Sequence, residues 1–278
     1  IMEKDEECIV FTPFFPEYTI FIKESGAKVV QVPGEEGTFQ IDMEKFEAAV
    51  NEKTKAVIVN SPNNPSGVVY SEETIVKLCD ILRKKEKEYG HPIFLITDEP
   101  YRELVYDDID VPYMINYYDN TFVCYSYSKA LSLPGERIGY IVVSNKMVDS
   151  KDAYAAVCGA GRVLGYVCAP SLFQKVIERC IDDTADISIY KTNRDLLYNS
   201  LTEMGFECVY PDGAFYLFVK AMEDDAKAFC EKAKEQELLL VPADSFGTPG
   251  YVRVSYCVQT EQIERALPAF KKLADSYK

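Results

Sequence analysis

The feature that most constrains the fold is a repeated alternation of short, nearly continuous apolar runs with amphipathic helical stretches. Apolar runs of this length, rich in β-branched residues, are typical of strands buried on both faces of a sheet. Helices between such strands favour a sheet that is mainly parallel and covered on both sides. We therefore predict an α/β fold. The predicted strands are residues 8–11, 28–32, 56–60, 92–98, 121–125 and 139–143.

The pattern changes near residue 150, where long helical stretches replace the alternation. We predict long helices over residues 150–180 and 184–204 and a last helix over 260–276. Short strands are predicted at residues 206–209, 214–219, 238–241 and 251–255. The sequence thus predicts a large domain over residues 1–150 and a smaller C-terminal α+β domain over residues 151–278, which includes the long linking helix.

Composition argues against several classes of function. The formal net charge of -15 argues against a nucleic acid partner, which needs a surplus of Lys and Arg. Hydrophobic residues make up 47% of the 278 residues, yet no apolar stretch is long enough to span a membrane. The nine cysteines are scattered singly, which predicts reduced thiols in a cytoplasmic protein and neither a disulfide scaffold nor a metal site.

Polar clusters follow three predicted strands at their carboxyl ends, where open α/β sheets bind ligands. Lys129 follows one strand and is flanked by hydroxyl groups, so its amine could be partly desolvated and nucleophilic. Asp98 ends another strand and could stabilise a protonated ring nitrogen. Asn64 lies in a third cluster, within a rigid turn of prolines and a glycine. Taken singly, the three clusters can also be interpreted as a surface lysine, a helix cap and a turn.

Together, and in this order, the clusters resemble the fold-type I aminotransferases of class I and II. The resemblance rests on three segments, NSPNNPSG at 60–67, TDEPY at 97–101 and SYSKALSLPGERIGY at 126–140. It extends over nearly the whole chain. It implies the pyridoxal 5'-phosphate (PLP) dependent transferase fold type I, with a large domain built on a mainly parallel sheet and a smaller α+β domain.

The resemblance implies catalytic roles for residues at the strand ends. Lys129 is expected to form a Schiff base with PLP and to move a proton between the substrate α-carbon and the cofactor. Asp98 is expected to keep the pyridine nitrogen protonated. Tyr101 and Asn64 are expected to bind the ring hydroxyl oxygen, and Asn64 also to contact the substrate.

The resemblance also implies the residues that bind the two anionic groups. Ser126, Ser128 and Arg137 are expected to hold the phosphate of PLP. Phe15 is expected to stack on the pyridine face. Arg253 is expected to clamp the α-carboxylate of the substrate through a bidentate ion pair.

The predicted function is the transfer of an amino group between an α-amino acid and a 2-oxo acid. Two alternatives remain open: another PLP reaction on the same scaffold (a lyase, a decarboxylase or a cyclopropane-carboxylate synthase), or an inactive truncated remnant. Family members carry a longer N-terminal segment with a glycine-rich turn that also binds phosphate, so we expect this sequence to be a fragment, the product of a truncated gene, or a cleaved product. Because their sites lie at a subunit interface, we also expect a homodimer.

Overall fold

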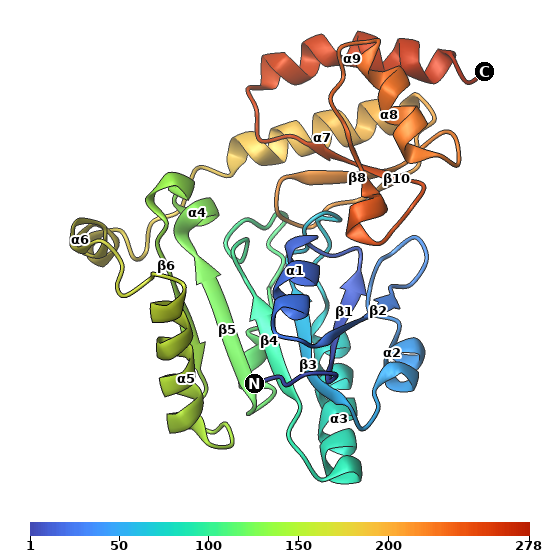
Figure 1. Cartoon of the computed structure of the whole chain (residues 1–278). Coiled ribbons are helices and arrows are strands. Elements are labelled where there is room, and N and C mark those ends of the chain that lie inside the picture. The colour runs from blue at the N-terminus through green and yellow to red at the C-terminus, as the bar shows by residue number, and fades with distance from the viewer.

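The larger of two β-sheets confirms the predicted α/β architecture. The computed structural model describes residues 1–278, and its first sheet has six strands in the order β2-β1-β3-β4-β5-β6 (Figure 1). The first five strands are parallel, and β6 runs antiparallel to β5 at one edge. The strands are β1 Glu7–Thr12, β2 Lys28–Pro33, β3 Thr54–Asn60, β4 Phe94–Asp98, β5 Thr121–Ser126 and β6 Gly139–Val143.

Strand β1 shows why the sheet needs helices on both faces. Ile9 and Phe11 belong to the apolar cluster shared with α2 (Met43–Ala49) and α3 (Glu72–Tyr89). Their neighbours Cys8 and Val10 belong to a separate cluster with α1 (Glu17–Glu24). Since successive side chains of a strand point to opposite faces, a run that is apolar throughout requires cover on both sides.

Helix α3 begins and ends where its local sequence dictates. The Ser71 side chain accepts a hydrogen bond from the Thr74 N–H at 3.1 Å, which caps the first turn. Gly90 ends the helix in the left-handed conformation. Between these ends, burial of each large apolar side chain contributes about 1.5–3 kcal/mol. The buried residues are Ile75, Leu78, Cys79 and Leu82, spaced to form one face.

The second sheet has four strands in the order β7-β8-β10-β9, with antiparallel pairing throughout. Helices α7, α8 and α9 lie over this sheet (Figure 1). A boundary between two domains at residues 150 and 151 stays a prediction. The elements are β7 Cys208–Val209, β8 Tyr216–Lys220, β9 Val241–Pro242, β10 Tyr251–Ser255, α7 Ser188–Glu203, α8 Ala226–Lys234 and α9 Thr260–Asp275, with short 3-10 turns at Met114–Asn116, Pro134–Glu136 and Ala243–Phe246.

Three predicted elements are wrong in extent, one of them the strand predicted over 206–209, of which only β7 forms. The helix predicted over residues 150–180 is divided into α5 (Ser150–Val163) and α6 (Ser171–Arg179), because Gly165 takes a φ of 87° and Pro170 cannot continue a hydrogen-bonded turn. The strand predicted over 238–241 is only β9, which has two residues and pairs with β10 alone.

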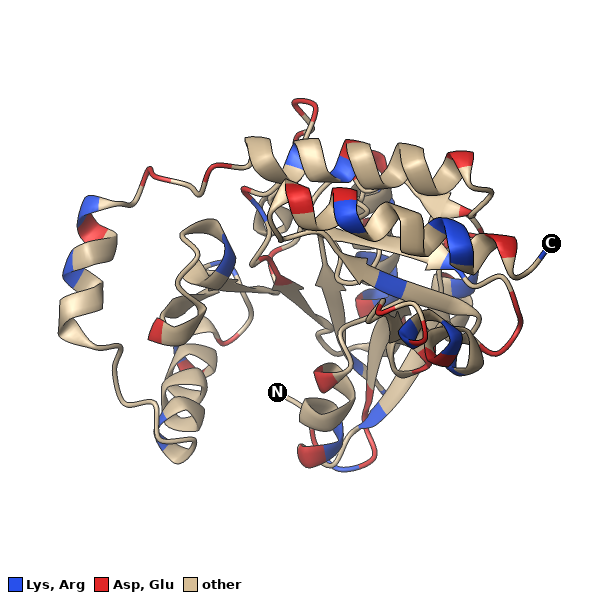
Figure 2. Ribbon diagram, turned by 90° about the horizontal axis from the view of Figure 1, so that it is seen from above, with Lys and Arg blue, Asp and Glu red and all other residues tan.

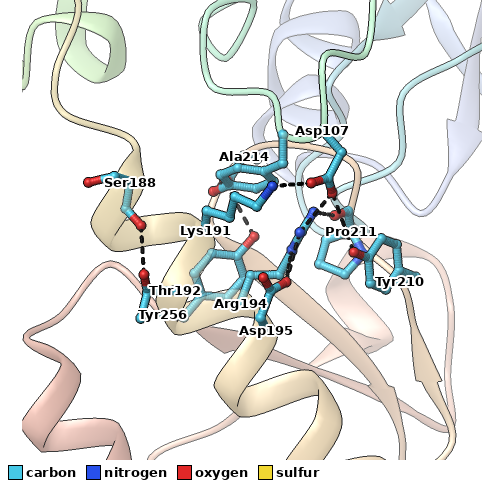
Figure 3. A network of polar contacts seen from close by, with 11 residues as sticks. Asp107, Ser188, Lys191, Thr192, Arg194, Asp195, Tyr210, Pro211, Ala214 and Tyr256 are labelled. Atoms are coloured by element: carbon cyan, nitrogen blue, oxygen red, sulfur yellow. Dashed lines mark hydrogen bonds and ion pairs between the residues drawn. The ribbon is translucent and has the colours of Figure 1, made fainter.

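A buried arginine ties α7 to the loop that follows β4 and to the loop that precedes β8. Arg194 is 1% exposed and pairs with Asp107 at 2.8 Å and Asp195 at 2.7 Å (Figure 3). It also donates to the Pro211 carbonyl at 3.3 Å. The Tyr106 hydroxyl donates to the carbonyl of Ala214, two residues before the cavity residue Tyr216.

Charged residues of both signs are interspersed over the helices and loops (Figure 2). No helix combines the length and the apolar character needed to cross a membrane. All nine cysteines are unpaired, and three of them, Cys158, Cys168 and Cys257, are exposed. No group of three or more His, Cys, Asp or Glu side chains has an arrangement that could hold a metal ion.

Candidate active site

All nine residues that the sequence predicts for the site line a single cavity of about 430 Å³. The cavity lies where the carboxyl ends of β3, β4 and β5 meet β8 and β10 of the second sheet. It therefore combines residues from both sheets. The lining residues are Phe15, Asn60, Asn64, Asp98, Pro100, Tyr101, Ser126, Ser128, Lys129, Pro134, Arg137, Tyr216 and Arg253.

The register of the parallel strands brings the polar strand ends together. Asn60 at the end of β3 pairs with Asp98 at the end of β4. The Asn60 side chain donates to the Asp98 carbonyl at 2.8 Å and accepts from the Asn64 N–H at 2.8 Å. Asn60 thus fixes the loop that carries Asn64. The sequence prediction gave Asn60 no role, although it stands at a strand end like Asp98.

A one-turn helix, α4 (Tyr127–Ala130), places Lys129 on the cavity wall directly after β5. Ser126 caps this turn through its side chain. The Lys129 Nζ lies 5.4 Å from the ring centre of Phe215 and 6.0 Å from that of Tyr101, and it forms no ion pair. Lys129 is therefore a cation held against aromatic rings, with no carboxylate of the chain to neutralise it.

Two hydroxyls and a guanidinium form a polar cradle beside Lys129. The Ser126 hydroxyl donates to the Ser128 hydroxyl at 2.6 Å. Arg137 has a φ of 53°, and its Nη1 donates to the Pro134 carbonyl at 2.8 Å. No acidic side chain pairs with Arg137, so the cradle retains donors for an anion.

Asp98 faces the cavity from a largely buried position. Its pKa is raised to about 6, chiefly by burial; the hydrogen bond from Tyr18 opposes this rise, and the nearby charge of Glu99 adds to it. The Tyr18 hydroxyl donates to Oδ2 of Asp98. The sequence prediction did not assign this contact. Its only indication in the sequence was the position of Tyr18, three residues after Phe15.

Arg253 in β10 presents an unpaired cation to the cavity. Its Nη1 donates to Asn64 Oδ1 at 2.9 Å, and its buried Nε has no partner. The guanidinium carbon lies 4.5 Å from the ring centre of Tyr216 and 5.1 Å from that of Phe246. These rings hold the guanidinium in place while leaving donors free for a carboxylate.

Aromatic side chains form part of the cavity wall, whereas two aromatic neighbours of Phe15 in the sequence do not. Phe15 and Tyr216 line the cavity. Phe14 is not among its lining residues and packs in the apolar cluster under α1. Tyr18 lies behind Asp98 and in edge-to-face contact with Phe15, with 5.6 Å between the ring centres.

These residues fit PLP by their chemistry. A buried carboxylate suits a protonated pyridine nitrogen, a lysine amine suits an aldehyde, and hydroxyls with a guanidinium suit a phosphate. The unpartnered Arg253 Nε matches a further anion. The fold and the cavity together are therefore those of a PLP-dependent enzyme that handles a carboxylate-bearing substrate.

Comparison with known proteins gives the family. Residues 1–270 match the model of "Aminotransferase class I and II". An aspartate aminotransferase of Thermotoga maritima is 32% identical over 99% of this chain and 71% of its own length. An aromatic-amino-acid aminotransferase of Thermococcus litoralis is 28% identical over 98% of this chain and 71% of its own length.

Solved structures agree with this result. The crystal structure of an aminotransferase from Eubacterium rectale superposes with a TM-score of 0.97 at 60% identity, and the match covers 100% of this chain and 70% of that one. The chain belongs to the class I and II aminotransferase family, and the predicted PLP-dependent fold type I is confirmed. Members of this family use PLP to transfer amino groups.

Proposed function

We propose that the cavity binds PLP beside an α-amino acid and passes the amino group on to a 2-oxo acid, with the nine predicted residues that line it in the roles predicted from the sequence. One observation carries the proposal. Three cations that have no ion pair, Lys129, Arg137 and Arg253, line one cavity together with Asp98. They match the three groups that such a reaction must hold: an aldehyde, a phosphate and a carboxylate.

The proposed cofactor contacts follow from the position of each side chain. Arg137, Ser126 and Ser128 would bind the phosphate, and Asp98 would hold the proton on the pyridine nitrogen. When bound, PLP supplies the aldehyde that takes up the amino group and a ring that withdraws electrons from the substrate α-carbon.

The remaining side chains around PLP would orient its ring. Phe15 would cover one face of the ring, and Tyr101 with Asn64 would donate to its hydroxyl oxygen. The Asn64 side chain already accepts from Arg253 through its Oδ1, which leaves its amide N–H groups free to donate. Asn64 can therefore contact the cofactor and the substrate-binding arginine at once.

Lys129 would move the proton that the reaction requires. Its Nζ faces the cavity from a short helix between the cofactor contacts of Ser128 and Arg137, so it can reach the α-carbon of a bound amino acid. The aromatic rings of Tyr101 and Phe215 lie 6.0 and 5.4 Å from Nζ, measured to the ring centres. A proton removed from the α-carbon would be retained on Nζ and delivered to the cofactor carbon.

Arg253 favours transamination over decarboxylation. A guanidinium fork that binds the α-carboxylate stabilises its charged form and holds it in place, whereas a decarboxylase must let this group lose its charge as CO₂. The Asn64 contact and the flanking rings hold the fork in one orientation. The geometry therefore supports a reaction that keeps the carboxylate.

A donor and acceptor screen tests the proposal. Since relatives are named as aspartate and aromatic-amino-acid aminotransferases, aspartate and phenylalanine are the first donors to supply with PLP and a 2-oxo acid. We expect one donor to yield its own oxo acid and a new amino acid in equal amounts, and Lys129→Ala to yield neither. Product formation without an acceptor would indicate a lyase instead.

We further infer a homodimer in the cytoplasm. Ile20 and Phe21 on α1 are 57% and 63% exposed, and adjacent apolar side chains on a surface helix are typical of an interface. The nine unpaired cysteines support a reducing compartment. Analytical ultracentrifugation tests the first inference, because a monomer at micromolar concentration would contradict it.

A further inference from the structure

The Asp98 carboxylate accepts a hydrogen bond from a tyrosine of another element. Tyr18, in the first turn of α1, donates its hydroxyl hydrogen to Oδ2 of Asp98, at the end of β4. Tyr18 is 6% exposed and packs in the apolar cluster under the sheet, so its side chain is almost wholly shielded from bulk water. Asp98 itself lines the cavity. One carboxylate oxygen is thus engaged behind the cavity wall.

This arrangement leaves the other carboxylate oxygen, Oδ1, for the cavity. The backbone under Asp98 is also fixed, since its carbonyl accepts from the Asn60 side chain at 2.8 Å. With the main chain and Oδ2 both held, the side chain has little freedom to turn away from a ligand. Tyr18 in addition contacts the edge of the Phe15 ring, so one residue supports two walls of the site.

The charges around this pair make the direction of the hydrogen bond clear. Burial, and next the charge of Asp98, raise the pKa of Tyr18 well above its usual range, so the proton stays on the tyrosine. The other titratable groups near the pair are Cys124 of β5, Glu99 and Tyr101, and the cations of the same cavity are Lys129, Arg137 and Arg253.

We propose that Tyr18 is a positioning residue, which aims the Asp98 carboxylate at the ring nitrogen of PLP and keeps that carboxylate ionised. The proposal rests on the function proposed for Asp98. A donor hydrogen bond stabilises an ionised carboxylate and opposes the effect of burial. Without Tyr18, Asp98 would take up a proton at a higher pH and would turn more freely.

The test compares Tyr18→Phe with Tyr118→Phe as a matched control. Tyr118 is also buried and also donates one hydrogen bond, to the Ile93 carbonyl at 2.8 Å, but it lies outside the cavity. The measurement is the dissociation constant of PLP as a function of pH. We expect roughly tenfold weaker binding in Tyr18→Phe, because Asp98 of the PLP-free variant takes up a proton at a higher pH, and each pKa unit corresponds to a factor of ten. The pH at which binding weakens on acidification should rise in this variant alone.

A double-mutant cycle shows whether Tyr18 acts through Asp98. In an Asp98→Asn background, Tyr18→Phe should change the PLP dissociation constant less than threefold, by our rough estimate. The reason is that this background lacks the carboxylate charge that the Tyr18 hydroxyl stabilises. Equal losses in both backgrounds, or equal behaviour of Tyr18→Phe and Tyr118→Phe, would overturn the proposal. If Asp98→Asn binds PLP like the wild type, the function proposed for Asp98 fails as well. If Asp98→Asn weakens binding and Tyr18→Phe does not, only the role of Tyr18 fails.

Discussion

The hydroxyl oxygens of Tyr101 and Tyr216 lie 3.0 Å apart inside the cavity. Tyr101 follows β4 of the first sheet, and Tyr216 begins β8 of the second, so this hydrogen bond joins the two sheets at the site. Burial, and then the neighbouring Tyr216, raise the pKa of Tyr101 well above its usual range, so its proton is retained. Tyr216 also supports Arg253 with its ring.

Tyr216→Phe and Tyr216→Leu should separate these two contributions of Tyr216. The Phe variant loses the hydrogen bond and should be less stable by about 1 kcal/mol in urea unfolding. Its KM for the amino donor should change little, because the ring under Arg253 remains. The Leu variant removes the ring and should raise that KM by roughly fivefold, the value of a cation–π contact of about 1 kcal/mol. Equal KM values in the two variants would contradict this division.

Arg253→Lys should weaken the binding of both substrates and leave the binding of PLP unchanged. A lysine keeps the charge but loses the planar fork, at a cost of about 1.5–3 kcal/mol for a hydrogen bond to a charged group. We expect KM for the amino acid and for the 2-oxo acid to rise by about 10- to 100-fold. The dissociation constant of PLP should stay close to that of the wild type. A variant that loses affinity for PLP alone would contradict the assignment of Arg253 to the substrate carboxylate.

Asp98→Asn should stabilise the PLP-free protein at neutral pH. The folded-state pKa of Asp98, about 6, lies above its ordinary value of 3.8, so the folded protein binds the proton more tightly than the unfolded chain does. Stability is therefore lost as the pH rises from about 4 to about 6, by up to about 3 kcal/mol. We expect the variant to be more stable above pH 6 and equal to the wild type near pH 4. A difference in unfolding free energy that does not vary with pH would exclude this explanation.

Removing the buried guanidinium of Arg194 should destabilise the fold without acting on the chemistry directly. Arg194→Met leaves the Pro211 carbonyl and two carboxylates without their shared donor (Figure 3). We expect a loss of about 3 kcal/mol in unfolding free energy, since breaking a buried ion pair costs 3–5 kcal/mol or so and these carboxylates still reach water. Arg265→Met, at an exposed arginine of α9, is the control and should change stability by less than about 0.5 kcal/mol.

Much of the first sheet could be predicted because its strands are apolar throughout and their polar ends recur at one edge. The extent of the helix over residues 150–180 was not predicted, because the apolar spacing continues past Gly165, although the positive φ of that glycine and the proline at 170 divide the helix. The short strand β9 was overextended for a similar reason: Leu238 and Leu240 are apolar and pack in the core but pair with no strand, and Leu239 is exposed.

Nine of the thirteen residues that line the cavity could be predicted from the sequence, but not the contacts behind them. Asp98, Lys129 and Arg137 stand in segments that resemble family motifs, and a motif names residues directly. The bond between Tyr18 and Asp98 spans 80 positions, and that between Tyr101 and Tyr216 spans 115. Such pairs depend on how α1 and β8 pack against the first sheet, which no local pattern of side chains encodes.

The most direct test of the central claim is to find which residue reacts with PLP. The protein would be incubated with PLP, treated with borohydride to reduce any bond between the cofactor and an amine, digested and analysed by mass spectrometry. We predict that the pyridoxyl mass is found on the peptide carrying Lys129 and is absent from that peptide in Lys129→Ala. Labelling confined to exposed lysines such as Lys77 and Lys175, or unchanged total labelling in the variant, would contradict the assignment of this cavity as the active site.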